Sequence, residues 1–197
     1  MRVGILALQG DVREHAAAVR RAGAEVAEIR TIDGFDDIDA LILPGGESTT
    51  MCLLLDKTGL RSPVEAWTRA GRPTLGTCAG LVLLADRVED GRVDQSPLGG
   101  LDIAVRRNGH GRQRHSFEAR VPCPALSGDF DAVFIRAPRI VEVGAGVTVL
   151  ASLESEGDLE PVVVQQGALI GCAFHPELAE DDRLLQLLLD RAEGAPS

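Results

Sequence analysis

The stretch Thr-Leu-Gly-Thr-Cys-Ala-Gly-Leu-Val-Leu-Leu-Ala, residues 74–85, decides the fold that we expect for this chain. An apolar run leads into Gly-x-Cys-x-Gly and a helix-forming run leads away, which is the strand–turn–helix pattern of a nucleophile elbow, here with cysteine. Gly76 and Gly80 remove side chains where strand and helix pass closely. Cys78 then begins a helix, whose unpaired N–H groups, starting with Ala79, favour a thiolate and a developing oxyanion. A buried structural cysteine is the alternative for this stretch alone.

Composition limits the class of protein. The 197 residues predict a single domain over 1–197 with a sizeable core. Twenty basic and 30 acidic residues give a net charge of −10, which argues against nucleic acid as the main partner. The four scattered cysteines indicate no metal site and no disulfide framework, and free thiols suit a cytoplasmic protein. The sequence contains neither a membrane span nor a signal peptide, so we expect no membrane partner.

The segments around residues 74–85 predict an α/β fold. Strands are expected at 2–8, 25–30, 40–43 and 73–77, and helices at 12–22, 51–55 and 63–70, the first of them capped by Asp11. This alternation predicts a central, mostly parallel sheet covered by helices. An added antiparallel section is expected from short strands at 101–106, 117–121, 132–135, 140–143, 148–152, 161–165 and 168–174. A last amphipathic helix is expected over 181–191, and residues 191–197 as a frayed tail.

The sequence His175-Pro176-Glu177 supplies a second half of a site. Proline disfavours the helical region for the residue before it, so His175 is expected to be extended, with Glu177 on the same side. A carboxylate beside an imidazole fixes its tautomer and raises its basicity, which prepares the ring to deprotonate a thiol. A solvated histidine and glutamate at a strand end is the alternative. Together with Cys78 at the end of another strand, the pattern favours a Cys-His-Glu triad.

Other segments carry polar residues where expected strands end. Gly46-Glu47-Ser48 follows the strand at 40–43, where ligands bind in open α/β sheets, and Ser48 either caps the next helix or binds a polar ligand. Arg107 opens a basic loop, and Arg136 follows an apolar strand. An arginine near a nucleophile commonly clamps a carboxylate through paired hydrogen bonds. The alternative for each arginine is a solvated loop charge.

These segments occur together and in order, and they closely resemble one family, the glutaminase subunits of pyridoxal 5′-phosphate synthase. The family is a triad-type (class I) glutamine amidotransferase, and the resemblance runs from Val3 to about Arg183. Its wider class shares the cysteine and His-Pro-Glu motifs, whereas Gly-Glu-Ser, Gly-Arg-Gln and Ile-Arg-Ala-Pro single out this family. One position departs from the pattern, because His110 stands where the family usually has an aromatic residue. The matching segments are 43–50, 76–80, 107–113, 116–118, 134–138 and 174–177.

The resemblance implies a three-layer, flavodoxin-like fold and hydrolysis of L-glutamine to L-glutamate and ammonia, without a cofactor. It implies that Cys78 attacks the amide, His175 carries the proton and Glu177 orients His175. The oxyanion donors it implies are Gly46 and Ala79, and its glutamine-binding positions are Gly46, Glu47, Ser48, Arg107, Ile135 and Arg136. It also implies that ammonia passes to a separate synthase subunit in a hetero-oligomeric complex that makes the vitamin B6 cofactor. Residues 8–10 match a segment at the docking face of that complex, and docking is what activates the glutaminase.

Three other interpretations were weighed against this one. The shared triad also fits an amidotransferase subunit of histidine or purine synthesis, although segments 107–113 and 135–138 argue against it. A non-catalytic scaffold would be expected to lack the nucleophile, histidine or glutamate, and all three are present. A redox-sensing Cys78 is chemically reasonable, but no resolving cysteine stands nearby in the sequence.

Overall fold

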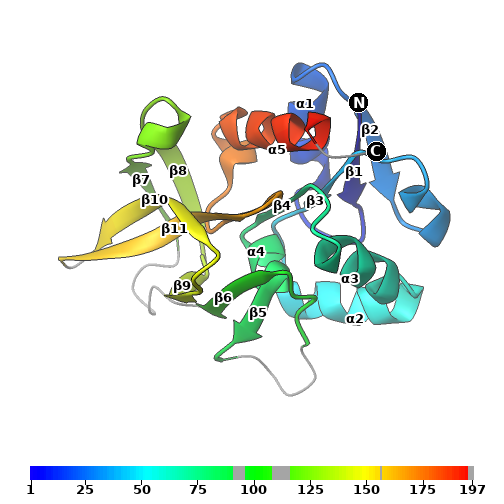
Figure 1. Ribbon diagram of the computed structural model, residues 1–197, viewed down its shortest axis with the longest axis horizontal. Coiled ribbons are helices and arrows are strands. Elements are labelled where there is room, and N and C mark those ends of the chain that lie inside the picture. Colours follow the sequence, from blue (N-terminus) through cyan, green and yellow to red (C-terminus); the bar gives the residue numbers. More distant parts are fainter. Residues whose placement is uncertain (91–95, 108–115, 156, 195–197) are drawn as a thin grey trace.

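The computed structural model describes residues 1–90, 96–107, 116–155 and 157–194, and its centre is one large sheet (Figure 1). Within this part of the chain, seven strands form the sheet in the order β10-β11-β12-β4-β3-β1-β2. Strands β12, β4, β3, β1 and β2 run parallel, whereas β11 pairs antiparallel with β12, and β10 pairs antiparallel with β11. The strands are β1 (Arg2–Leu6), β2 (Glu25–Ile29), β3 (Ala40–Leu43), β4 (Thr74–Thr77), β10 (Thr148–Ser155), β11 (Asp158–Gln166) and β12 (Leu169–Cys172).

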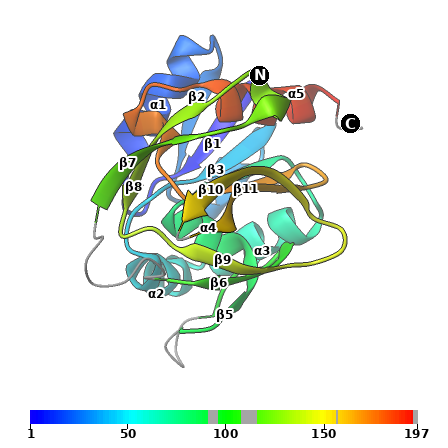
Figure 2. The same ribbon diagram turned by 90° about the vertical axis from the view of Figure 1, so that its left-hand side faces the viewer.

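Helices cover both faces of this sheet. On one face lie α1 (Val12–Arg21) and α5 (Arg183–Glu193), and on the other lie α2 (Ser48–Thr58), α3 (Arg61–Arg69) and α4 (Ala79–Leu84) (Figures 1 and 2). Each helix turns apolar side chains to the sheet; α5, for example, buries Leu184, Leu185, Leu188 and Leu189. The predicted three-layer α/β fold is therefore confirmed.

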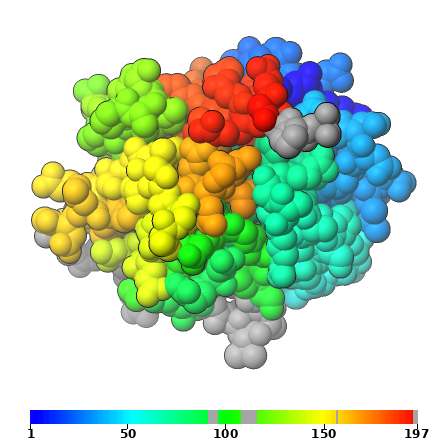
Figure 3. Space-filling model, viewed as in Figure 1, coloured from blue at the N-terminus to red at the C-terminus, as the bar shows by residue number. Residues whose placement is uncertain are grey.

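The added antiparallel section also forms. Strands β5 (Ala85–Val88), β6 (Leu101–Arg106) and β9 (Arg139–Val143) make a small mixed sheet, and β7 (Ser116–Val121) pairs with β8 (Phe130–Ile135). The β10–β11 hairpin protrudes at the left edge of the space-filling view (Figure 3). Short 3-10 turns occur at η1 (Ile32–Phe35), η2 (Pro124–Leu126) and η3 (Pro176–Leu178).

Several element boundaries differ from those expected. The second helix begins at Ser48 rather than Met51, because Glu47 caps it and extends its first turn. The apolar run after Cys78 stops being helical at Leu84, and β5 pairs with β6 instead; this strand was missed. Residues 191–193, expected to fray, belong to α5, and residues 195–197 lie outside the described part. No helix among the described residues is long and apolar enough to cross a membrane.

Candidate active site

The pairing of β4 with β12 brings Cys78 and His175 to one edge of the sheet. The two strands are adjacent and parallel, with Thr77 opposite Cys172. The N–H of Cys78 donates to the Cys172 carbonyl at 2.8 Å, so the residue after β4 is tied to the end of β12. Beyond β12, the N–H of His175 donates to the Val133 carbonyl on β8 at 2.9 Å. Both side chains therefore follow the carboxyl ends of parallel strands, the usual ligand edge of such sheets.

The elbow around Cys78 depends on close packing of its glycines. A Cβ on Gly80 would lie 1.9 Å from the Leu43 carbonyl oxygen, and one on Gly76 would lie 2.6 Å from the Gly80 carbonyl oxygen. Cys78 itself has φ 48° and ψ −101°, a backbone conformation that residues other than glycine rarely adopt. Helix α4 begins at the next residue, Ala79. The tight strand–turn–helix connection expected from the sequence is present.

His175 is held by two carboxylates. Its Nδ1 lies 2.8 Å from Glu177 Oε1 and 3.2 Å from Asp11 Oδ2. His175 and Glu177 are nearly fully buried, with 4% and 6% of their surface exposed, whereas the Asp11 carboxylate reaches the cavity. The contact between Glu177 and His175 is the one expected. The sequence predicted it from extended chain at both residues, but Glu177 lies in the 3-10 turn η3, and His175 immediately precedes that turn.

Asp11 does not do what the sequence suggested. It occupies the N-cap position of α1, as expected, but its side chain makes no capping hydrogen bond. The carboxylate turns instead toward His175, which lowers the pKa of Asp11 through that hydrogen bond. The expectation of a side-chain cap was therefore wrong, because an imidazole across the site offers this carboxylate a partner with more charge.

These contacts set the protonation of His175. Burial lowers the pKa of the imidazole, but hydrogen bonds with Asp11, Cys78 and Glu177 outweigh burial and raise the pKa to about 12. The ring is consequently held as an imidazolium beside the sulfur. A neighbouring positive charge of this kind favours the thiolate form of a cysteine.

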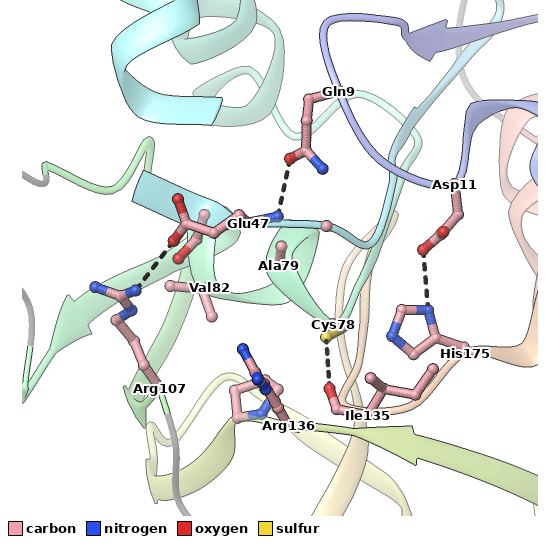
Figure 4. Close-up of a pocket in the computed structure, with 13 residues that line it drawn as sticks. Gln9, Asp11, Glu47, Cys78, Ala79, Val82, Arg107, Ile135, Arg136 and His175 are labelled. Atoms are coloured by element: carbon pink, nitrogen blue, oxygen red, sulfur yellow. Dashed lines mark hydrogen bonds and ion pairs between the residues drawn. The ribbon is translucent and has the colours of Figure 1, made fainter. Parts of the chain in front are cut away.

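A cavity of about 470 Å³ opens over Cys78 (Figure 4). The cavity is lined by every residue that the sequence assigned to catalysis or glutamine binding, except Glu177, which lies behind His175. Four of the lining residues were not assigned to the site: Gln9, Asp11, Val82 and Pro138. Gln9 and Asp11 follow β1, the parallel neighbour of β3, so their position at the carboxyl end of a strand was a usable signal.

Glu47 and Arg107 meet at one side of this cavity. Arg107 Nη2 lies 3.2 Å from Glu47 Oε1. The Glu47 carboxylate also accepts from the N–H groups of Thr49 and Thr50 and thus caps α2, a role the sequence gave to Ser48 as one of two options. Burial raises the pKa of Glu47, but the hydrogen bonds from Thr50 and Thr49 outweigh it and lower the pKa to about 2. Glu47 therefore keeps its negative charge across the physiological range.

The loop that carries Gly46 and Glu47 is held by Gln9. The N–H of Glu47 donates to Gln9 Oε1 at 2.8 Å (Figure 4). On the opposite wall, Cys78 Sγ donates to the Ile135 carbonyl at 3.8 Å, and Arg136 follows with φ 46°. Two of the few non-glycine residues with positive φ, Cys78 and Arg136, thus face the same cavity. Backbone strain of this kind gathers at functional sites.

The one group among the described residues that offers three metal-ligand atoms within reach of each other is Asp11, His175 and Glu177. Its members meet at Nδ1 of His175 at 2.8 and 3.2 Å, which are hydrogen-bond distances. We interpret the group as an imidazole held by two carboxylates, and the absence of a metal stays a prediction. His110, where the family usually has an aromatic residue, lies outside the described residues, as does the rest of the loop at 108–115.

Comparison with known proteins adds to this geometry. The chain matches the SNO glutamine amidotransferase family over residues 5–193. It is 48% identical to pyridoxal 5′-phosphate synthase subunit PdxT of Geobacillus sp. (strain WCH70), across 99% of this chain and 98% of that protein. It is also 48% identical to the subunit of the same name from Mycolicibacterium vanbaalenii, across 95% of each. A crystal structure of a glutamine amidotransferase superposes with a TM-score of 0.88 at 44% identity, covering 97% of this chain and 98% of the other.

Proposed function

Because this chain belongs to the SNO glutamine amidotransferase family, we propose that it hydrolyses L-glutamine to L-glutamate and ammonia as the glutaminase subunit of a pyridoxal 5′-phosphate synthase. The observation that carries the proposal is the placement of Cys78 and His175 at the ends of neighbouring strands, in one cavity. Relatives that are nearly half identical over almost the whole chain bear the name of that synthase subunit.

The cavity suits an amino acid with a side-chain amide. Arg107 would pair with the α-carboxylate of glutamine, since a guanidinium binds a carboxylate through two hydrogen bonds. Glu47, ionised and beside Arg107, would attract the α-ammonium group. Ser48, Ile135 and Arg136 complete the walls between these charges and Cys78. The amide would then lie over the sulfur.

The reaction would proceed through a thioester. Sγ of Cys78 attacks the side-chain carbonyl carbon, and the N–H groups of Gly46 and Ala79 receive the negative charge on its oxygen. The C–N bond breaks as His175 gives its proton to the departing ammonia. Once the sulfur is acylated, His175 loses one of the contacts that raise its pKa, so it can accept a proton from water. Attack of that water on the thioester releases glutamate and restores the thiolate of Cys78 beside the protonated His175.

The ammonia would be used by a second protein. The relatives are named as subunits of a synthase, so we propose that a synthase subunit docks on this chain and receives the ammonia. Docking near residues 8–10 would act on the site directly, because Gln9 holds the loop that carries Gly46. The glutaminase alone would then be slow, and the complex fast.

Glutamate release from glutamine tests this proposal, measured with the chain alone, with a pyridoxal phosphate synthase subunit, and with Cys78→Ala in each condition. We expect clear stimulation by the synthase, and a loss of at least about a thousandfold in the variant. Turnover without stimulation would retain the glutaminase and reassign the partner. No turnover in either condition, from a folded chain, would overturn the proposal in favour of a scaffold.

A further inference from the structure

His15 is a buried histidine that the proposed reaction does not use. It lies on α1, one helical turn after Asp11, and only 3% of its surface is exposed. It is absent from the cavity lining, so it has no contact with a substrate there. A buried imidazole has to find polar partners for its ring nitrogens. Those partners identify what His15 does.

The partners of His15 come from both halves of the triad. Its Nε2 lies 3.1 Å from Thr77 Oγ1, on the residue immediately before Cys78. The same nitrogen lies 3.6 Å from Oε2 of Glu177, the carboxylate whose other oxygen bonds His175. His15 thus stands between the strand that carries the nucleophile and the turn that orients the base.

The electrostatics of this contact favour a neutral ring. Burial lowers the pKa of His15, and the nearby carboxylates of Glu177 and Asp11 offset this only in part. The tautomer that serves both contacts carries its proton on Nε2. That nitrogen is hydrogen-bonded to Thr77 Oγ1 and lies 3.6 Å from Glu177 Oε2, which is a buried oxygen with no hydrogen-bond partner among the described residues. A polar neighbour is what keeps such an oxygen from rotating away.

We propose that His15 is a positioning residue: its hydrogen bond to Thr77 fixes the ring beside the second oxygen of Glu177 and limits the movement of that carboxylate, so that His175 stays aimed at Cys78. The inference deepens the proposed glutaminase and rests on it. Under this proposal, helix α1 both covers the sheet and supports the active site. Asp11 at the N-cap of α1 would thus act on His175 from the cavity side, and His15 one turn later would act on Glu177 from the buried side.

The test compares two amides of different length in the full chain, bound to its synthase subunit. In His15→Gln, the amide nitrogen reaches about as far as Nε2, whereas in His15→Asn it stops one methylene short. We expect His15→Asn to lower kcat about 10- to 100-fold with KM within about twofold, and His15→Gln to recover most of this loss. Val19→Ala is the matched control, because Val19 is fully buried on the same helix, one turn after His15, and does not line the cavity.

A second measurement is independent of glutamine. The rate at which iodoacetamide alkylates Cys78, followed by peptide mass spectrometry, reports the thiolate that His175 supports. We expect this rate at pH 7 to fall several-fold in His15→Asn, and to stay near wild type in His15→Gln and Val19→Ala. Equal behaviour of the two amides, or an equal defect in Val19→Ala, would overturn the positioning role. Wild-type alkylation without glutamine turnover would fault the proposed function alone.

Discussion

Asp11 Oδ2 lies 3.2 Å from Nδ1 of His175, the same nitrogen that Glu177 approaches to 2.8 Å. The imidazole of His175 therefore has two carboxylates near one atom, Nδ1. Glu177 is buried beneath it, and Asp11 reaches it from the cavity side. The second carboxylate adds to the charge that keeps the ring protonated.

Replacing Asp11 by asparagine tests this arrangement. The hydrogen bond that Asp11 accepts raises the pKa of His175, so Asp11→Asn should lower that pKa. We expect the titration curve of His175, followed by NMR of its ring protons, to move to lower pH by roughly half to one pH unit. Asp158→Asn makes the same change in net charge on the distant β10–β11 hairpin and should leave the curve in place. An unshifted curve in Asp11→Asn would remove Asp11 from the network.

Arg107→Ala should act on binding. Arg107 lies on the wall of the cavity beside Glu47, and we propose that it anchors the α-carboxylate of glutamine, an interaction present equally in the ground state and the transition state. We expect KM for glutamine to rise about 10- to 100-fold with kcat within a few-fold. Arg87→Ala is the control, since Arg87 pairs with Glu142 on the β5–β6–β9 sheet and lines no part of this cavity. A fall in kcat at constant KM would contradict the binding role.

Glu47→Gln should reveal the cap on α2 through its pH dependence. The pKa of Glu47 is lowered from 4.5 to about 2 in the folded chain, so its carboxylate stabilises the fold above pH 4.5 and this contribution disappears as the pH falls toward 2. The thermal midpoint of Glu47→Gln should therefore lie below wild type at pH 6, and the gap should narrow as the pH is lowered. A gap that stays constant from pH 6 to pH 3 would show that the charge of Glu47 adds nothing.

Gly80→Ala should disrupt the elbow. The new Cβ would lie 1.9 Å from the Leu43 carbonyl oxygen, which belongs to the neighbouring strand and has no room to yield. We expect destabilisation of at least about 3 kcal/mol, or failure to fold, measured by urea unfolding. Gly146→Ala is the matched control, because its nearest neighbour would be 3.8 Å away, and it should remain within about 0.5 kcal/mol of wild type. Similar stability of the two variants would contradict this account of the turn.

The sequence predicted the layers of the fold because its signals were local. Gly76-x-Cys78-x-Gly80 specifies a turn through steric contacts within a few residues, and alternating strands and helices specify a parallel sheet. What the sequence could not reveal depends on contacts across the fold. Asp11 reads as a helix cap until His175, which follows another strand, offers it a different partner. The same holds for β5, which is a strand only because β6 pairs with it.

The expectations for individual site residues show the same difference between local signals and contacts across the fold. The structure gathers the expected residues around one cavity, apart from Glu177 behind His175, while their roles stay predictions. Neither His15 nor Gln9 was assigned to the site. The strand end could have placed Gln9 there, but nothing in a single sequence connects its side chain to the Glu47 N–H, or His15 to Thr77. Such links exist only once the strands are side by side.

The position of β12 between β11 and β4 governs when this site can exist during synthesis. Strand β4 leaves the ribosome long before β12. Until residues 169–172 are synthesised, the backbone groups on one edge of β4 lack the hydrogen bonds that β12 supplies. Strand pairings between segments far apart in the sequence form slowly, and an unpaired strand edge is prone to aggregate with other chains until the pairing forms. A chain cut short before β12 would carry Cys78 without His175. Ammonia production by the proposed enzyme is thereby restricted to full-length chains that have completed the sheet.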